Sequence, residues 1–340
     1  MKFGASRQSN FELLRLLSMF FIVFYHLLRW FVQENPTFDC VRALWLPLHV
    51  GVLIFVFLSG YFHIRTSSRG LILLLGIVFV YSIPGMVSGI KNAGNTHDII
   101  QSLMFISRSE FWFVKVYLGL FLIAPLLNAF LDNSSIQSKW YLVCVCALIS
   151  MYFGSFSDNL SVAEGKNLFS FMLYYQIGHL LKEYSPKWKS LKIKPLVVGY
   201  CLLNLVIVVA FLLLRGKWSG NLLWKLCFPY NSPILVLNAV ALFILVGRLE
   251  FSSGLINRLA EHSFSIYLIH SISLVVLFVE RPLINGIFHH FADNIFITVP
   301  ILFILALLIM AGCLLIDSFF RPLWKGIDRF GEMVQARIGF

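Results

Sequence analysis

Charged residues are scarce in this sequence of 340 residues. Only 13% of the residues are Asp, Glu, Lys or Arg, whereas about a quarter are charged in a typical soluble domain. Hydrophobic residues account for 59% of the chain, and the mean hydropathy is +0.83. This composition excludes an ordinary soluble protein and predicts an integral membrane protein.

The sequence also lacks the cysteine spacing of a disulfide framework. Its six cysteines form no Cys-x-x-Cys pair, and most lie in apolar runs, so we interpret them as packing residues. The first apolar segment is too long for a removable signal peptide, and no small-residue cleavage site follows it. Nucleic acid is not expected as a partner, because basic loops on one side of a membrane explain the net charge of +11 better.

Ten apolar runs are each close to the ~20 residues that a helix needs to cross the hydrocarbon core. They predict an all-α polytopic membrane protein whose spans cover residues 11–31, 44–63, 70–90, 111–131, 140–156, 167–182, 195–214, 231–248, 264–280 and 295–318. The connections are short, so we expect one membrane domain over residues 1–340 with no soluble domain. Any chemistry then takes place within the bilayer or at its two faces.

The distribution of Lys and Arg predicts the orientation of these spans. An even number of spans places both termini on one side. If that side is the cytoplasm, sixteen Lys and Arg lie in the inner segments and nine in the outer ones, which is the usual bias of membrane proteins. We therefore expect both termini to be cytoplasmic.

The first predicted span carries ionisable residues although it is apolar enough to cross a bilayer. Arg15 and His26 are eleven positions apart, which on an α-helix is three turns plus about 20°, so they share one face about 16 Å apart along the axis. Met19 and Ile22 lie between them on that face, and Glu12 is one turn from Arg15, within pairing distance. Ionisable groups inside a span are costly, so they indicate function.

Sorting the polar residues by depth along the alternating spans gives two clusters. The inner cluster is basic and suits a phosphate-bearing anion, because Arg forks match phosphate oxygens in pairs. The outer cluster combines imidazoles, a cation and an aromatic ring, which suits a sugar hydroxyl; its members are His26, His49, Lys115 and Trp112. The histidines are scattered in depth and lack ligand spacing, so no metal is expected.

Each of these residues also has a structural interpretation. Arginines that follow a span are typical of a topology signal, and a tryptophan at a span edge is typical of an aromatic belt. Histidines near span ends often snorkel to the interface. For Arg15 and His26, the structural alternative is a polar clamp between helices.

Five segments follow one another in an order that is known from one membrane family. The first is Arg15, ten intervening residues and His26, with Glu12 ahead of them. The others are FVFLSGYF at 55–62, FWFVKVYLGLFLIAPLLN at 111–128, YNSPILVLNAVALF at 230–243 and SFSIYLIH at 263–270. Together they resemble, over essentially the full length, the acyltransferase 3 family of integral-membrane O-acyltransferases. The similarity is greatest to its capsule, exopolysaccharide and enterobacterial-common-antigen O-acetyltransferases, although Phe121 stands where many members have a tyrosine.

The resemblance implies an enzyme of the bacterial inner membrane that moves an acetyl group to a hydroxyl of a cell-surface or lipid-linked glycan. Acetyl-CoA is then a co-substrate that enters from the cytoplasm, and no cofactor is bound. Arg15 would hold the pantetheine arm or polarise the thioester carbonyl, and Glu12 would orient Arg15. The acyl-CoA phosphates would meet a basic set at the inner mouth: Arg65, Arg69, Arg258 and His63.

On the acceptor side, the resemblance implies that His26 is the general base toward the sugar hydroxyl, or a transient acyl carrier. The acceptor, polymeric or polyprenyl-linked, would be lined by Lys115, Trp112, His49 and Tyr117. His270 and Tyr267 would support the site from behind. Membrane lipid is the remaining expected partner; the sugar and the oligomeric state do not follow from the sequence.

Two other classes of protein compete with an enzyme. A transporter or flippase of a glycan intermediate or acyl group would use the same polar stripe as a pathway. Transporters often contain inverted repeats and helices broken by Gly or Pro. The only hints of such features in this sequence are Pro84, Gly85 and Pro125, and these residues are not in symmetric halves. A membrane scaffold gives no reason for Arg15 and His26 to share a stripe.

Overall fold

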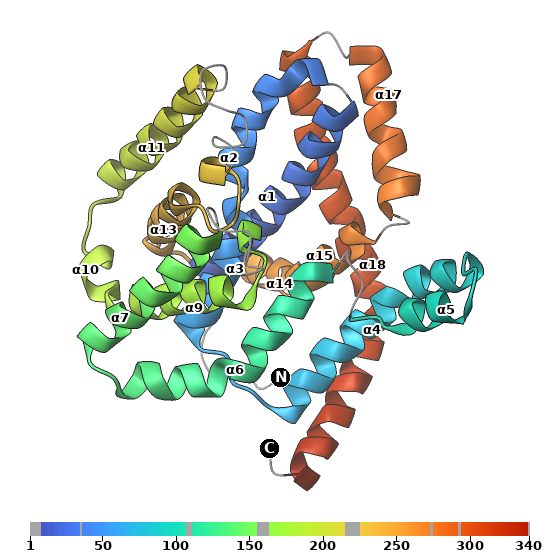
Figure 1. Ribbon diagram of the computed structural model, residues 1–340, viewed down its shortest axis with the longest axis horizontal. Coiled ribbons are helices and arrows are strands. Elements are labelled where there is room, and N and C mark those ends of the chain that lie inside the picture. Colours follow the sequence, from blue (N-terminus) through green and yellow to red (C-terminus); the bar gives the residue numbers. More distant parts are fainter. Residues whose placement is uncertain are drawn as a thin grey trace. The chain divides into compact units, whose positions relative to one another are not determined.

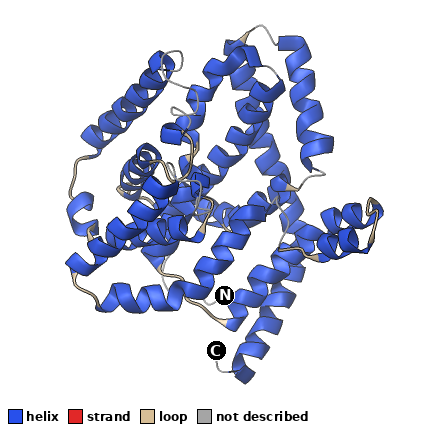
Figure 2. Ribbon diagram, in the orientation of Figure 1, coloured by secondary structure: helices blue, strands red, loops and turns tan. Residues whose placement is uncertain are grey.

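Helices dominate the computed structural model, which describes residues 8–34, 36–106, 111–154, 163–214, 225–272, 275–291 and 294–338. Across these residues there are helices and loops but no strand (Figure 2). The prediction of an all-α fold is therefore confirmed. Five of the basic residues used to predict the orientation lie outside the described residues: Lys2, Arg7, Arg108, Arg215 and Lys217.

Seven helical segments of the described residues are long and apolar enough to cross a membrane. Five of them lie in single helices: α1 (Ser9–Glu34), α4 (Ser68–Lys91), α6 (Trp112–Asn133), α11 (Ile193–Leu214) and α18 (Ile295–Ile338) (Figure 1). A sixth segment, Cys40–Phe62, consists of the last part of the 3-10 helix η1 (Pro36–Leu44) followed by α2 (Trp45–Leu48) and α3 (Val50–Phe62). The seventh joins α7 (Ile136–Ala147) to the π-helix η3 (Leu148–Phe153). Each segment covers all or most of one predicted span. The chain is therefore a polytopic membrane protein, while the full set of ten spans and the cytoplasmic termini stay predictions.

The other three predicted spans contain shorter helices. α9 (Leu168–Glu183) matches 167–182, and the apolar α13 (Pro233–Gly247) matches 231–248. The span predicted at 264–280 is not one continuous helix. α15 (Ser263–Ser271) ends where Ile272 becomes extended, and the π-helix η5 (Val276–Glu280) comes later. Beyond the span predicted to end at residue 318, α18 continues to Ile338 as a more polar helix.

Side-chain caps explain where several helices begin. A Ser or Asn before the first turn accepts a hydrogen bond from a backbone N–H three residues later, which satisfies a group that has no partner within the helix. The capping residues are Ser67, Asn95, Ser135, Asn167, Ser232 and Ser253. The sequence analysis did not anticipate the short helices α5 (Thr96–Leu103), α10 (Ser185–Lys189), α14 (Gly254–Ala260) and α17 (Arg281–Phe291), or the 3-10 turn η4 (Ala163–Gly165).

The chain forms two compact units. The first unit comprises residues 1–64 and 126–261, and the second comprises residues 65–125 and 262–340. The division falls within α6, whose residues up to Pro125 belong to the second unit and whose last turns belong to the first. Each unit therefore combines segments that are far apart in the sequence.

Within the first unit, ring contacts define how α1 and α3 are arranged. Near the start of α1, the Phe11 ring lies 4.7 Å from the Tyr61 ring near the end of α3. Near the end of α1, the Tyr25 ring lies 4.1 Å from the ring of His49, which directly precedes α3. The two helices are therefore antiparallel, which agrees with the alternating direction that the sequence predicts for the first two spans.

Two glycines bring α3 and α9 into backbone contact. A Cβ atom on Gly60 would lie 2.8 Å from the carbonyl carbon of Tyr175, and closer still to its oxygen. Reciprocally, a Cβ atom on Gly178 would meet the carbonyl group of Phe57. Small residues at helix interfaces permit this approach in membrane proteins. The glycine of the FVFLSGYF motif thus has a packing role.

Within the second unit, α4 packs along the C-terminal part of α18. The Arg69 guanidinium at the start of α4 donates to both carboxylate oxygens of Asp328, over 2.7 and 2.6 Å, and also pairs with Glu332. Three turns further along α4, the Tyr81 hydroxyl donates to Asp317 over 2.6 Å. These contacts explain why α18 extends beyond its predicted end: the extra turns supply partners for α4.

Asp317 is a buried carboxylate that gathers three donors in the second unit. It is 4% exposed, accepts hydrogen bonds from Tyr81 and from Trp324 Nε1 at 2.9 Å, and pairs with His262 Nδ1. His262 and Asp317 are 55 residues apart, and the sequence analysis singled out neither, because no local pattern links them.

Replacing Asp317 with alanine is expected to destabilise the protein by about 1 to 3 kcal/mol for each buried donor that it leaves without an acceptor, and Tyr81, Trp324 and His262 all lose theirs. Thermal denaturation of the purified protein in detergent measures the change. Asp317→Asn should recover part of the loss, because an amide oxygen still accepts from Tyr81 and Trp324. Glu250→Gln is the control, since Glu250 forms an exposed pair with Arg248. An unchanged melting temperature in Asp317→Ala contradicts the prediction.

Candidate functional site

Arg15 is held by the predicted ion pair at the beginning of α1. Its Nη1 atom donates to both carboxylate oxygens of Glu12, over 2.9 and 3.0 Å. The guanidinium carbon lies 5.9 Å from the centre of the Phe62 ring at the end of α3. Glu12 is buried, whereas the Arg15 side chain keeps 32% of its surface exposed. The pair therefore fixes the direction of a cation that ligand or solvent can still reach.

The face of α1 that carries Arg15 and His26 is turned toward α3. Met19 and Ile22, which lie between them on this face, are buried. A Cβ atom on Gly51 of α3 would lie only 2.9 Å from Cγ1 of Ile22, so the helices touch there. Arg15 and His26 are both half-buried. Met19 and Ile22 are thus covered by packing, while Arg15 and His26 at the two ends each keep part of their surface exposed.

His26 lies beside an aromatic cluster at the end of α1 opposite to Arg15. Its ring is 5.5 Å from the ring of Tyr25, which in turn contacts His49. The His49 ring is 7% exposed and lies 5.1 Å from the Tyr230 ring. Among the described residues, His49 Nδ1 has no hydrogen-bond partner. A buried polar atom in this state is rare in native structures.

The predicted acceptor residues of α6 belong to the second unit. Phe113 stacks on Tyr117 with ring centres 5.5 Å apart and contacts Tyr267 of α15 at 5.4 Å. Tyr267 contacts the buried His270, whose Nδ1 hydrogen-bonds the Ile266 carbonyl in its own helix. Tyr117, Tyr267 and His270 are therefore joined through Phe113.

Other predicted residues are not brought together within one unit. Trp112 is half-buried and Lys115 exposed, and both lie in the second unit, whereas His26 and His49 lie in the first. The outer cluster as a whole therefore stays a prediction.

The predicted basic set of the inner mouth is also divided between the units. Arg65 and Arg69 belong to the second unit, and Arg258 and His63 to the first. Arg65 and Arg258 are exposed; Arg258 Nε donates to the Gly254 carbonyl of its own helix. Arg69 already binds two carboxylates, so it would have to exchange them for phosphate oxygens. The acyl-CoA role of all four residues stays a prediction.

His63 belongs to a cluster that the sequence analysis missed. Its Nε2 atom hydrogen-bonds Nδ1 of His179 in α9 over 2.8 Å, and the two rings are stacked. Its Nδ1 atom lies 3.9 Å from a carboxylate oxygen of Asp132 at the end of α6. A signal was available: His63, Asp132 and His179 all lie at the inner ends of predicted inward-running spans, the second, fourth and sixth.

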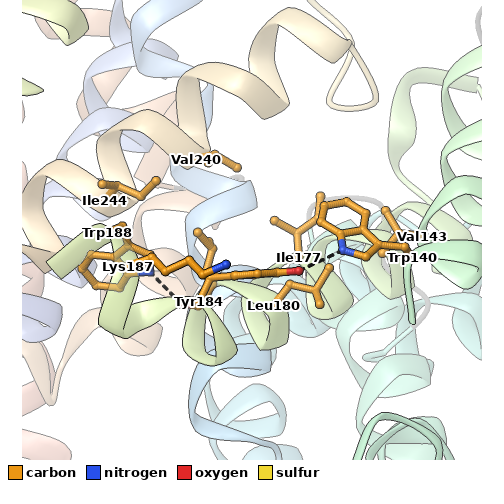
Figure 3. Close-up of a pocket in the computed structure, with 10 residues that line it drawn as sticks. Trp140, Val143, Ile177, Leu180, Tyr184, Lys187, Trp188, Val240 and Ile244 are labelled. Atoms are coloured by element: carbon orange, nitrogen blue, oxygen red, sulfur yellow. Dashed lines mark hydrogen bonds between the residues drawn. The ribbon is translucent and has the colours of Figure 1, made fainter. Parts of the chain in front are cut away.

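An apolar cavity in the first unit has no residue of α1 among its described lining. It measures about 410 Å³ and is lined from α7, α9, α10 and α13. Figure 3 shows Trp140 and Tyr184 meeting in it, joined by a 3.3 Å hydrogen bond, with Lys187 nearby. Among its described lining residues there is no predicted site residue. Its chemistry suits a hydrocarbon chain rather than phosphates or sugar hydroxyls.

Comparison with known proteins identifies the family of the chain. A family model of an acyltransferase domain, acyltransferase 3, matches residues 8–317 and so includes most of both units. Neither a curated protein nor a solved structure matches the chain. The matched region contains all five motifs and every predicted site residue. The chain therefore belongs to the acyltransferase 3 family and is a membrane acyltransferase.

Proposed function

We propose that this acyltransferase moves an acetyl group from cytoplasmic acetyl-CoA to a hydroxyl of a cell-surface or lipid-linked glycan, in a bacterial inner membrane. The single observation that carries the proposal is the α1 stripe. It has a carboxylate-held guanidinium at one end and an imidazole beside an aromatic cluster at the other. These two ends match a thioester donor that arrives from one face and a sugar acceptor that arrives from the other.

In the proposed reaction, the acceptor hydroxyl oxygen attacks the carbonyl carbon of the acetyl thioester. His26 takes the hydroxyl proton, a C–O bond forms, the C–S bond breaks, and CoA leaves as a thiol after it receives that proton. An acyl-histidine route, in which His26 first carries the acetyl group, uses the same residue. Imidazole suits both routes because it exchanges protons near neutral pH.

The length of the stripe favours one of the two roles considered for Arg15. Arg15 and His26 lie about 16 Å apart along α1, so a group attacked beside His26 lies far from the Arg15 guanidinium. A pantetheine arm is long and carries amide carbonyls that an Arg fork can bind. We therefore assign Arg15 to holding the arm and Glu12 to keeping Arg15 in position.

The aromatic cluster supports an acceptor site at the His26 end. Sugars bind through their hydroxyls and their apolar ring faces, which hydrogen-bonding side chains and aromatic rings accommodate. Tyr25, His49 and Tyr230 form a buried aromatic backing there, and the half-buried His26 is the polar group in front of it that a sugar could reach. This arrangement favours a neutral sugar over a second anion.

Release of CoA from acetyl-CoA by the purified protein tests the proposal. We expect release to depend on an added glycan acceptor and the product to gain the mass of one acetyl group per modified sugar. A glycan transporter or flippase would instead move its substrate in vesicles without releasing CoA. If no acceptor becomes acetylated and the glycan nevertheless moves across the vesicle membrane, the proposal is contradicted and that alternative is favoured.

A further inference from the structure

We propose that His63, Asp132 and His179 form a binding site for one divalent transition-metal cation, with Zn²⁺ as the best fit. All three belong to the first unit, and one ligand atom from each lies within 4.8 Å of the others. Imidazole and carboxylate are common ligands of Zn²⁺, and three protein ligands leave a fourth position for water. The proposal replaces the expectation from sequence that no metal is bound.

The backbone of His63 has an unfavourable conformation that neighbouring residues hold in place. His63 has φ of 61°, in the region that residues other than glycine rarely adopt and that costs about 1 to 3 kcal/mol. The next residue is held on both sides: the N–H of Ile64 donates to the Tyr175 hydroxyl over 3.1 Å, and its carbonyl accepts from Asn128 Nδ2 over 3.0 Å. Strain that the surroundings enforce in this way is typical of functional positions.

The distances between the candidate ligand atoms are close to those around a bound Zn²⁺ ion but differ from them in detail. Tetrahedral Zn²⁺ with bonds of about 2.0 to 2.1 Å separates two nitrogens by about 3.3 Å. The 2.8 Å hydrogen bond between His63 and His179 would therefore lengthen slightly as the cation replaces the shared proton. Asp132 can complete the set because its side chain is 53% exposed, which leaves it room to change rotamer.

A carboxylate lies beside the His179 ring, on the side away from His63. Glu183 Oε2 lies 3.8 Å from His179 Nε2, and Lys139 Nζ donates to the same oxygen over 2.9 Å. The 3.8 Å distance is too long for a hydrogen bond, but the negative charge favours a proton on Nε2, which leaves the lone pair of the other nitrogen available to a cation. Here the other nitrogen is Nδ1, the atom that faces His63.

Metal titration of the whole protein tests this site. The protein is purified in detergent with a tag that contains no histidine, treated with a chelator, and titrated with Zn²⁺ by calorimetry and with Co²⁺ by visible absorption. We expect one cation per chain, a tetrahedral Co²⁺ spectrum, and a melting temperature that Zn²⁺ raises, since a ligand of the folded state stabilises it.

Three variants make the test specific. His63→Gly removes a ligand while it relieves the positive φ, so the protein should fold yet lose stoichiometric binding. Glu183→Gln removes a negative charge 3.8 Å from His179 Nε2 and should weaken binding by less than the roughly 10- to 100-fold typical of a hydrogen-bonded outer partner. His97→Ala is the matched control, because His97 and Asp98 form an exposed pair at the same 3.9 Å separation, and it should bind like the wild type. No stoichiometric binding by the wild type, or equal binding by folded His63→Gly, overturns the proposal.

Discussion

The His26→Ala variant is expected to release CoA in the presence of acceptor at least about 100-fold more slowly than the wild type, because general-base assistance contributes roughly 10²- to 10⁴-fold. Alanine removes the imidazole that would take the hydroxyl proton or carry the acetyl group. His26 is half-buried at the end of the stripe, so the truncation should leave the packing of α1 on α3 intact. The measurement is the rate of CoA thiol release by purified protein at saturating acetyl-CoA.

Two controls separate chemistry from folding in this experiment. The melting temperature and elution profile of His26→Ala should match those of the wild type. His97→Ala, an exposed substitution on α5, should retain the wild-type rate. If folded His26→Ala transfers acetyl groups at the wild-type rate, His26 has no place in the mechanism, and the polar clamp between helices becomes the better account of the stripe.

The Gly60→Ala variant is expected to lose the folded state of the first unit, or at least about 3 kcal/mol of stability, the upper end of the range for overpacked cores. The added methyl would collide with the carbonyl group of Tyr175, and neither helix can move aside without also breaking the contact at Gly178. Displacing α9 would also shift Tyr175 and His179, which hold the turn after α3. Yield of monodisperse protein and its melting temperature in detergent report the effect.

Gly199 provides the matched control for this prediction. It also lies inside a helix of the first unit, α11, but a Cβ atom there would meet nothing within 4 Å. Gly199→Ala should therefore be neutral or stabilise by about 0.5 to 1 kcal/mol, because alanine is the better helix former. Equal melting temperatures for Gly60→Ala and the wild type would show that the α3–α9 contact is looser than described.

The pairing of Glu12 with Arg15 shows what kind of contact is predictable from sequence. The two residues are on one helix, so the 3.6-residue period alone brings them together, and the structure gives 2.9 Å between them. Arg69 shows the opposite case. Its position after a span suggested a free cation for phosphates, but its partners Asp328 and Glu332 lie more than 250 residues away in the chain, on helical turns that the hydropathy pattern did not include.

The amino-acid sequence by itself determined that this protein is helical and membrane-embedded, that its motifs are those of an acyltransferase, and which residues share a face of α1. The helicity, the membrane embedding and the shared face depend on hydrophobicity and helical period, which act locally along the chain, whereas the motifs indicate an acyltransferase through their resemblance to a known family. The tertiary structure decided which ends meet: Gly60 against Tyr175, His262 with Asp317, and His63 between Asp132 and His179. The depth of a residue along a span can be predicted from the sequence. Its neighbours at that depth depend on how helices distant in the chain pack together, and no local sequence pattern specifies this packing.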